Sequence, residues 1–156
     1  MDSFIGTINA KVDSKGRVIL PAPFRKILQS SGESHIVLRK DVYKDCLILY
    51  PETIWKEELS KLQSQLNDWD EQQRHLFRHI SLNVDSLELD SNGRILISKK
   101  YMLEANLSND VCFIGINNTI EVWNPFLLKK SLMSADDYKI QVQKLLGSKL
   151  ENKKIN

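Results

Sequence analysis

The sequence predicts an α+β protein made of two pseudo-symmetric ββαββ repeats, each followed by helices. The first observation is that Val12–Leu20 (VDSKGRVIL) recurs 77 residues later as Leu89–Ile97 (LDSNGRILI). The second is that residues with strand-type patterns precede and follow the turn in both copies. Pro51 and Pro125 come directly after the last expected strand of the first and second copy. Two copies of one folding unit in 156 residues predict a single body with internal pseudo-twofold symmetry.

The first copy opens with two strand patterns around a tight turn. Thr7–Val12 alternates apolar and polar residues, so it is expected to be a strand with one buried face. Asp13–Gly16 has turn composition, because Asp accepts backbone N–H bonds and Gly tolerates a positive φ. Arg17–Leu20 returns as a second strand, which predicts a β-hairpin with Arg17 directly after its turn.

The remaining elements follow the same order in both copies. Pro21–Pro23 ends the first hairpin and starts a short helix that reaches Gly32. The elements expected after it are His35–Leu38 and Cys46–Tyr50 in the first copy, then Arg94–Ile97, Lys100–Ala105, Val111–Ile116 and Thr119–Trp123 in the second. The offset falls from 77 to 74 by Pro51 and Pro125, so we expect three residues to be missing from the second copy's last hairpin loop.

Helical stretches follow each copy. They are Glu52–Leu66, Glu71–Ser81, Pro125–Met133 and Asp136–Leu150. We expect residues 1–82 to form the first repeat with its helical pair, and residues 83–156 to form the second repeat with the C-terminal helices. Neither half is large enough to bury a core well by itself, so the halves are expected to pack on each other.

The composition is that of an ordinary globular protein, with 42% hydrophobic and 27% charged residues. The sequence has no apolar run of membrane-spanning length and no signal-peptide pattern at its start, so we expect a cytoplasmic protein with no membrane partner. Cys46 and Cys112 lie far apart without a CxxC spacing, which favours small buried strand residues over a zinc site or a disulfide.

No catalytic motif occurs in the sequence, so we expect no enzyme activity, no catalytic residues and no cofactor, and no small-molecule ligand is evident. His75 and His79 have the i, i+4 spacing that metal ligands use on a helix, but Arg74 and Arg78 crowd the same surface with positive charge. We therefore expect a solvated basic helix face there and no metal site.

Basic residues concentrate around the first copy of the repeated turn. Residues 7–28 contain five basic side chains and one acidic, whereas the matching residues 84–105 contain three basic and four acidic. The two repeats therefore share a shape but not an electrostatic character.

The repeated Asp-Ser-x-Gly-Arg turn has two interpretations. It could be only a tight hairpin in which Arg17 pairs with Asp13 on the surface. Against that, the arginine recurs as Arg94 while its neighbour changes from Lys15 to Asn92, and a rigid turn can hold an arginine against a guanine edge or a phosphate. The basic residues that could hold phosphates are Lys11, Lys15, Arg25 and Lys26. These features predict binding to double-stranded DNA.

The motif F-x-G at Phe4–Gly6, followed by DSKGRVILP at Asp13–Pro21 and FRK at 24–26, resembles the MraZ family of bacterial transcriptional regulators. The second half resembles it too, through LDSNGRIL and VCFIGINNTIEVW, so the resemblance covers almost the whole chain. It implies a double-split β-barrel of the AbrB/MazE type, formed by two swapped-hairpin units. It also implies a ring-like homo-oligomer, associated with the nucleoid, that binds direct repeats in its own promoter and regulates the division and cell-wall gene cluster.

Carried over residue by residue, the family's DNA-reading motif falls on Asp13 and Arg17 and on Asp90 and Arg94, with Lys15 at the basic position of the first turn. The departures from the family pattern are Ile5, Ser98 and Tyr101–Met102, where a basic residue, a proline and an arginine are usual. From the charge distribution we expect Arg17 to be the principal reader and Arg94 the weaker contact. The alternative is a protein-interaction module of the same fold, such as an antitoxin-like partner or an assembly scaffold.

Overall fold

The computed structural model describes residues 2–155 and has the mixed α+β architecture expected from the sequence. Its contacts divide the chain into two units, Met1–Pro125 and Phe126–Asn156. The first unit contains β1 (Thr7–Lys11), β2 (Arg17–Ile19), α1 (Ala22–Ser30), β3 (His35–Lys40), β4 (Cys46–Pro51), α2 (Glu52–Gln65), α3 (Glu71–Leu82), β5 (Val84–Glu88), β6 (Arg94–Leu96), α4 (Lys99–Glu104), β7 (Asp110–Ile116) and β8 (Thr119–Trp123). The second unit contains α5 (Pro125–Ser131), without its first residue Pro125, and α6 (Ala135–Ile155). None of the helices in the described part of the chain has the length and apolar composition needed to cross a membrane.

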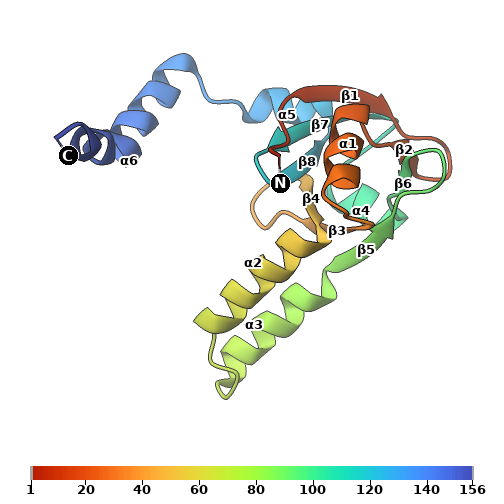
Figure 1. Ribbon diagram of the computed structural model, residues 1–156, viewed down its shortest axis with the longest axis horizontal. Coiled ribbons are helices and arrows are strands. Elements are labelled where there is room, and N and C mark those ends of the chain that lie inside the picture. The colour runs from red at the N-terminus through yellow and green to blue at the C-terminus, as the bar shows by residue number, and fades with distance from the viewer. Residues whose placement is uncertain (1, 156) are drawn as a thin grey trace. The chain divides into compact units, whose positions relative to one another are not determined.

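Strands of the two repeats exchange partners. Within residues 2–155, six strands form one antiparallel sheet in the order β1-β7-β8-β4-β3-β5, and β2 pairs with β6 in a separate ribbon (Figure 1). The β-hairpin predicted for Thr7–Leu20 is therefore wrong, because β1 pairs with β7 of the second repeat and not with β2. The reason is the length of the partner: β1 pairs along all of Thr7–Lys11 with β7, whereas β2 offers only Arg17–Ile19.

The exchange is symmetric about a pseudo-twofold axis. Val18 pairs with Ile95, its own equivalent 77 residues later. Ile48 likewise pairs with Glu121, its equivalent 73 residues later. The axis therefore passes through the middle of the β2–β6 ribbon and through the β4–β8 pair, and each half of the chain contributes three strands to the sheet.

The strand registers also locate the residues that differ in number between the repeats. Leu38 lies opposite β5 and Phe113 lies opposite β1, at equivalent positions of the two repeats. Their residue numbers differ by 75. Their hairpin partners, Leu49 and Val122, have an offset of 73. Two residues are thus missing between β6 and β7, where α4 is shorter than α1, and two from the hairpin loop, while one is added before Pro125. Counted between the strand ends, the loop of the second copy, residues 117–118, is three residues shorter than residues 41–45 of the first, as expected, because β7 also extends one position further than β3.

The main core lies between the sheet and the ribbon with helices α1 and α4. The rings of Phe4 and Phe24 meet edge to face with their centroids 5.5 Å apart. The buried members from the second repeat include Leu87, Ile95, Ile97, Tyr101, Val111, Phe113, Ile120 and Val122. Because apolar side chains of both repeats fill this one core, each repeat depends on the other to exclude water.

Helices α2 and α3 run side by side and antiparallel, away from the strands (Figure 1). Neither helix contains a fully buried residue. Near the start of α2, Trp55 packs against a small cluster of Val37, Ile48 and Tyr50. This cluster lies on the side of the sheet away from the main core. The helical pair is thus an appendage of the sheet.

Candidate nucleic-acid interface

Asp13 holds the first turn together through both of its carboxylate oxygens. Oδ1 accepts backbone N–H bonds from Lys15 and Arg17, each 2.9 Å long, and Oδ2 accepts the Nε–H of Arg17 at 2.8 Å. The backbone closes the same turn, because the Asp13 N–H donates to the Arg17 carbonyl at 2.9 Å and the Gly16 N–H donates to the Asp13 carbonyl at 3.1 Å. The Asp-x-x-x-Arg spacing therefore fixes the orientation of the arginine.

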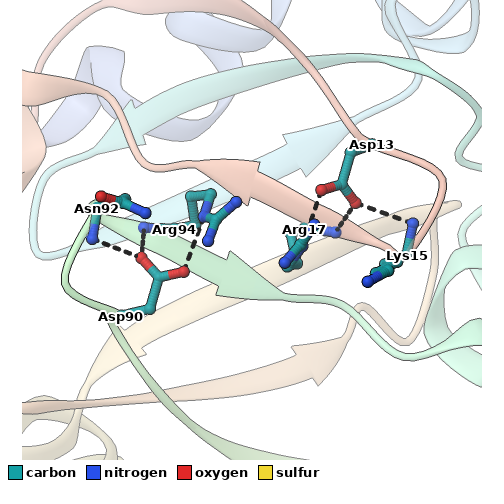
Figure 2. Close-up of polar contacts among 6 residues, drawn as sticks. All are labelled: Asp13, Lys15, Arg17, Asp90, Asn92 and Arg94. Atoms are coloured by element: carbon teal, nitrogen blue, oxygen red, sulfur yellow. Dashed lines mark hydrogen bonds and ion pairs between the residues drawn. The ribbon is translucent and has the colours of Figure 1, made fainter.

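The second turn repeats this geometry at the opposite end of the ribbon (Figure 2). Asp90 accepts the backbone N–H groups of Asn92 and Arg94 at 2.9 Å and the Nε–H of Arg94 at 2.8 Å. The pKa of Asp13 and that of Asp90 lie below the ordinary value of 3.8, mainly because the backbone N–H of the following arginine donates to each carboxylate. Both carboxylates are therefore ionised at neutral pH, and both arginines are held.

The two turns need glycine for partly different reasons. Gly16 has a φ of +86° and Gly93 a φ of +77°, which other residues rarely adopt. A β-carbon at Gly16 would lie 2.5 Å from the backbone oxygen of Ile97, whereas one at Gly93 would lie 2.8 Å from Cδ of Arg25. The main chain of the other repeat thus covers the first turn, and a flexible side chain covers the second.

Both arginines lie on the outward face of the ribbon, because the middle residue of each strand is buried and neighbours alternate. Arg17 lies opposite Leu96 and Arg94 lies opposite Ile19. The arginines therefore occupy a diagonal of the ribbon, where backbone positions are roughly 7–8 Å apart. The Nε–H of each guanidinium donates to an aspartate. Among the described residues, no hydrogen-bond acceptor is bound by the Nη atoms of either arginine. Two oriented guanidinium edges thus remain available to a ligand.

Lys11, a predicted phosphate contact, is engaged in an ion pair. Its Nζ lies 3.1 Å from Oδ1 of Asp110 on the neighbouring strand. The equivalent pair in the other repeat has its acidic and basic positions reversed, with Glu88 Oε1 2.6 Å from Nε2 of His35. Exposed pairs of this kind are weak, so Lys11 can reach a phosphate only in competition with Asp110.

Arg25 lies beside the second turn and not beside the first. Its Nη1 donates to the carbonyl of Leu20 at 2.5 Å, and its side chain covers Gly93. The expectation that Arg25 adds charge around the first turn is wrong, because the exchange of β2 with β6 carries each helix to the turn of the opposite repeat. Lys26 is exposed on the same helix.

Helix α4 of the second repeat borders the first turn in the same way. A cleft of about 510 Å³ separates them, and its lining includes Lys15, Lys99 and Met102. Met102 is the equivalent of Arg25, so the first turn lacks the arginine that the second turn receives. Nothing in the local sequence indicates Lys99 as a neighbour of Lys15, since their proximity depends on strand exchange.

The histidine, cysteine and acidic side chains outside the two turns were also candidates for a site. The described residues contain no group of three or more His, Cys, Asp or Glu side chains that could hold a metal ion. Cys46 and Cys112 are buried on β4 and β7, and both pair with Trp123 of β8, so a strand separates them. Burial raises the pKa of Cys46 to about 12, which keeps its thiol protonated and unreactive.

The fold and the site together define the class of this protein. It is a small α+β protein of two interlocked repeats, and each repeat supplies one Asp-x-x-x-Arg turn to a shared ribbon. The family model described as "MraZ protein, putative antitoxin-like" matches residues 3–78 and 81–132 of this chain. The chain belongs to the MraZ family.

Relatives with the name "Transcriptional regulator MraZ" match most of the chain. The protein of Bacteroides thetaiotaomicron is 42% identical over 147 residues, which is 94% of each chain. That of Phocaeicola vulgatus is 41% identical over 145 residues, covering 93% of this chain and 94% of the relative. That of Shewanella oneidensis is 36% identical over 121 residues, covering 78% of this chain and 79% of the relative. The similarity therefore spans both repeats.

Proposed function

We propose that this chain is a transcription regulator that binds double-stranded DNA through the outward face of the β2–β6 ribbon. The observation that carries this proposal is the diagonal pair Arg17 and Arg94, each oriented by an aspartate and each with its Nη edge available. The name of the relatives supports it, since it denotes a regulator of transcription and not a class of enzyme.

The chemistry of the ribbon suits the major groove of DNA. The groove admits a two-stranded β-ribbon, and arginine there donates two hydrogen bonds to O6 and N7 of guanine. Because Asp13 and Asp90 hold Nε, each guanidinium is oriented before DNA arrives, and less side-chain freedom is lost on binding. The pseudo-twofold axis between the arginines presents them to the groove in opposite directions.

Basic side chains at both ends of the ribbon would hold the phosphate backbone. Lys15 and Lys99 lie at the first turn, and Arg25 lies at the second with Lys26 on its helix. Contacts of this kind fix the position of a protein on the duplex without selecting a sequence. Sequence selection is left to the outward face of the ribbon, where Arg17 and Arg94 lie.

The assembly that we propose is a ring-like homo-oligomer in which the ribbon and sheet of each chain form a double-split β-barrel of the AbrB/MazE type. Its proposed operator is a set of direct repeats in its own promoter, at the division and cell-wall gene cluster, on the nucleoid. One ribbon makes few base contacts, so several ribbons of one oligomer on successive repeats would raise the affinity through effective concentration.

Footprinting on the DNA directly upstream of the protein's own gene tests this function. We expect protection of repeated sequences, and fluorescence anisotropy should show tighter binding to that duplex than to a scrambled duplex of equal length. The logarithm of the binding constant should fall linearly with the logarithm of salt concentration, with a slope of about −0.9 for each neutralised phosphate. Absence of a footprint, or equal affinity for the scrambled duplex, would reject DNA recognition and favour a protein-interaction module.

A further inference from the structure

We propose that Ile19 and Leu96 determine part of the sequence specificity by contacting thymine methyl groups next to the guanines bound by Arg94 and Arg17. This inference rests on the proposed function and assigns a role to the rest of the ribbon's outward face. It starts from two aliphatic side chains that the core does not use.

Ile19 and Leu96 are each 53% exposed, whereas the strand residues between the outward positions, Val18 and Ile95, are 1% and 0% exposed. The alternation of a β-strand places Ile19 and Leu96 on the same face as the two arginines. The two exposed aliphatic residues are also equivalents in the repeat, so the pseudo-twofold axis relates them. The outward face of the ribbon therefore carries two arginines and two exposed aliphatic side chains.

The register places each aliphatic side chain beside an arginine. Arg17 lies opposite Leu96 and Arg94 lies opposite Ile19, and β-carbons of directly opposite residues are about 4.5–5.5 Å apart. Successive bases on one DNA strand are about 3.4 Å apart along the helix axis. An aliphatic side chain beside an arginine on guanine therefore falls one or two base pairs from that guanine.

The chemistry of this face matches the major groove better than it matches a protein surface. An apolar protein partner would cover Ile19 and Leu96 but would also desolvate two guanidinium groups without supplying acceptors, which is unfavourable. The major groove supplies both kinds of partner, since guanine offers two acceptors and thymine offers a C5-methyl group that apolar side chains contact. The mixed composition of the face thus favours DNA as its occupant.

Deoxyuridine substitution tests the inference, because deoxyuridine differs from thymidine only by that methyl group. The probe is the footprinted promoter duplex with each thymine within two base pairs of a protected guanine replaced in turn. We expect the wild-type protein to lose roughly fourfold in affinity at the contacted positions, the value of one buried methyl group. Ile19→Ala should abolish the sensitivity at one such position and Leu96→Ala at another.

Ile116→Ala is the matched control, since Ile116 is an exposed aliphatic residue on β7, outside the ribbon. This variant should keep the full deoxyuridine sensitivity. Urea unfolding of every variant should show an unchanged midpoint, so that loss of sensitivity is not a loss of fold. Sedimentation should show an unchanged oligomeric mass.

Three results would overturn the inference. If the wild-type protein binds selectively and depends on Arg17 but is insensitive to deoxyuridine at every position, the inference is wrong and the proposed function stands. If the sensitivity persists in both Ile19→Ala and Leu96→Ala while the oligomeric mass falls, the aliphatic residues belong to a contact between copies of the chain. If the wild-type protein shows no selective binding, the proposed function and the inference fail together.

Discussion

The first and second turns of this protein have the same skeleton and different surroundings. In both, aspartate accepts two backbone bonds of 2.9 Å and one guanidinium bond of 2.8 Å. The tip carries Lys15 in the first turn and Asn92 in the second, and the neighbouring helix presents Met102 to the first and Arg25 to the second. The geometry of each site is thus encoded locally, whereas its charge depends on the segments that the fold places beside it.

The largest difference between the turns should appear in stability. Gly16→Ala should destabilise the protein by about 2–5 kcal/mol, because its β-carbon adds a clash with a backbone oxygen to the left-handed strain. Gly93→Ala should destabilise it by about 1–2 kcal/mol, because the side chain of Arg25 can move away. Urea unfolding measures both free energies, and equal losses would show that the covering backbone near Ile97 adjusts as easily as the side chain.

The next largest effect concerns DNA binding by the two arginines. Arg17→Ala and Arg94→Ala should each weaken binding to the footprinted duplex by about 1–3 kcal/mol and reduce the preference over a scrambled duplex. We expect Arg94→Ala to be the milder change, because the first turn has the basic Lys15 at its tip where the second has Asn92, and Arg25 beside the second turn is already held by the Leu20 carbonyl. Anisotropy with one duplex tests this order, and equal losses would contradict it.

A smaller effect should follow from exchanging the residues at the tips of the turns. Lys15→Asn should make the salt-dependence slope less steep by about 0.9, and Asn92→Lys should make it steeper by the same amount, since in the proposed complex each tip lies against one phosphate. The double exchange should restore the wild-type slope. Lys61→Asn, on the exposed α2 helix, is the control and should leave the slope unchanged. If Asn92→Lys leaves the slope unchanged, the second turn does not contact DNA.

The smallest effect should be the pH dependence of stability that the two aspartates share. Their native pKa values lie below 3.8, so their contribution to folding is present above the ordinary carboxyl pKa and is lost as the pH falls through the lower native values. Asp13→Asn and Asp90→Asn should therefore each flatten the acid limb of the stability curve. Urea midpoints between pH 6 and pH 2.5 measure this. Flattening by only one of the two variants would contradict the equivalence of the turns.

The succession of strands along the chain and the two turns could be predicted from the sequence because they depend on local chemistry. The alternation in Thr7–Val12 and the turn composition of Asp13–Gly16 specify a strand and a tight turn whatever the partner. Choice of partner could not be predicted in this way, since the same alternation suits pairing with β2 or with β7. The predicted hairpin and the predicted place of Arg25 were wrong for this one reason.

By itself, the sequence determined that the chain has two repeats, that each contains an aspartate-held arginine, and that the first repeat is the more basic. Only the tertiary structure decided that β2 and β6 form one ribbon, that α1 and α4 cross to the opposite turns, and that Ile19 and Leu96 face outward beside the arginines. The physical reason is that backbone preferences act within a few residues. Partners and neighbours are selected by the burial of apolar surface from both repeats in one core.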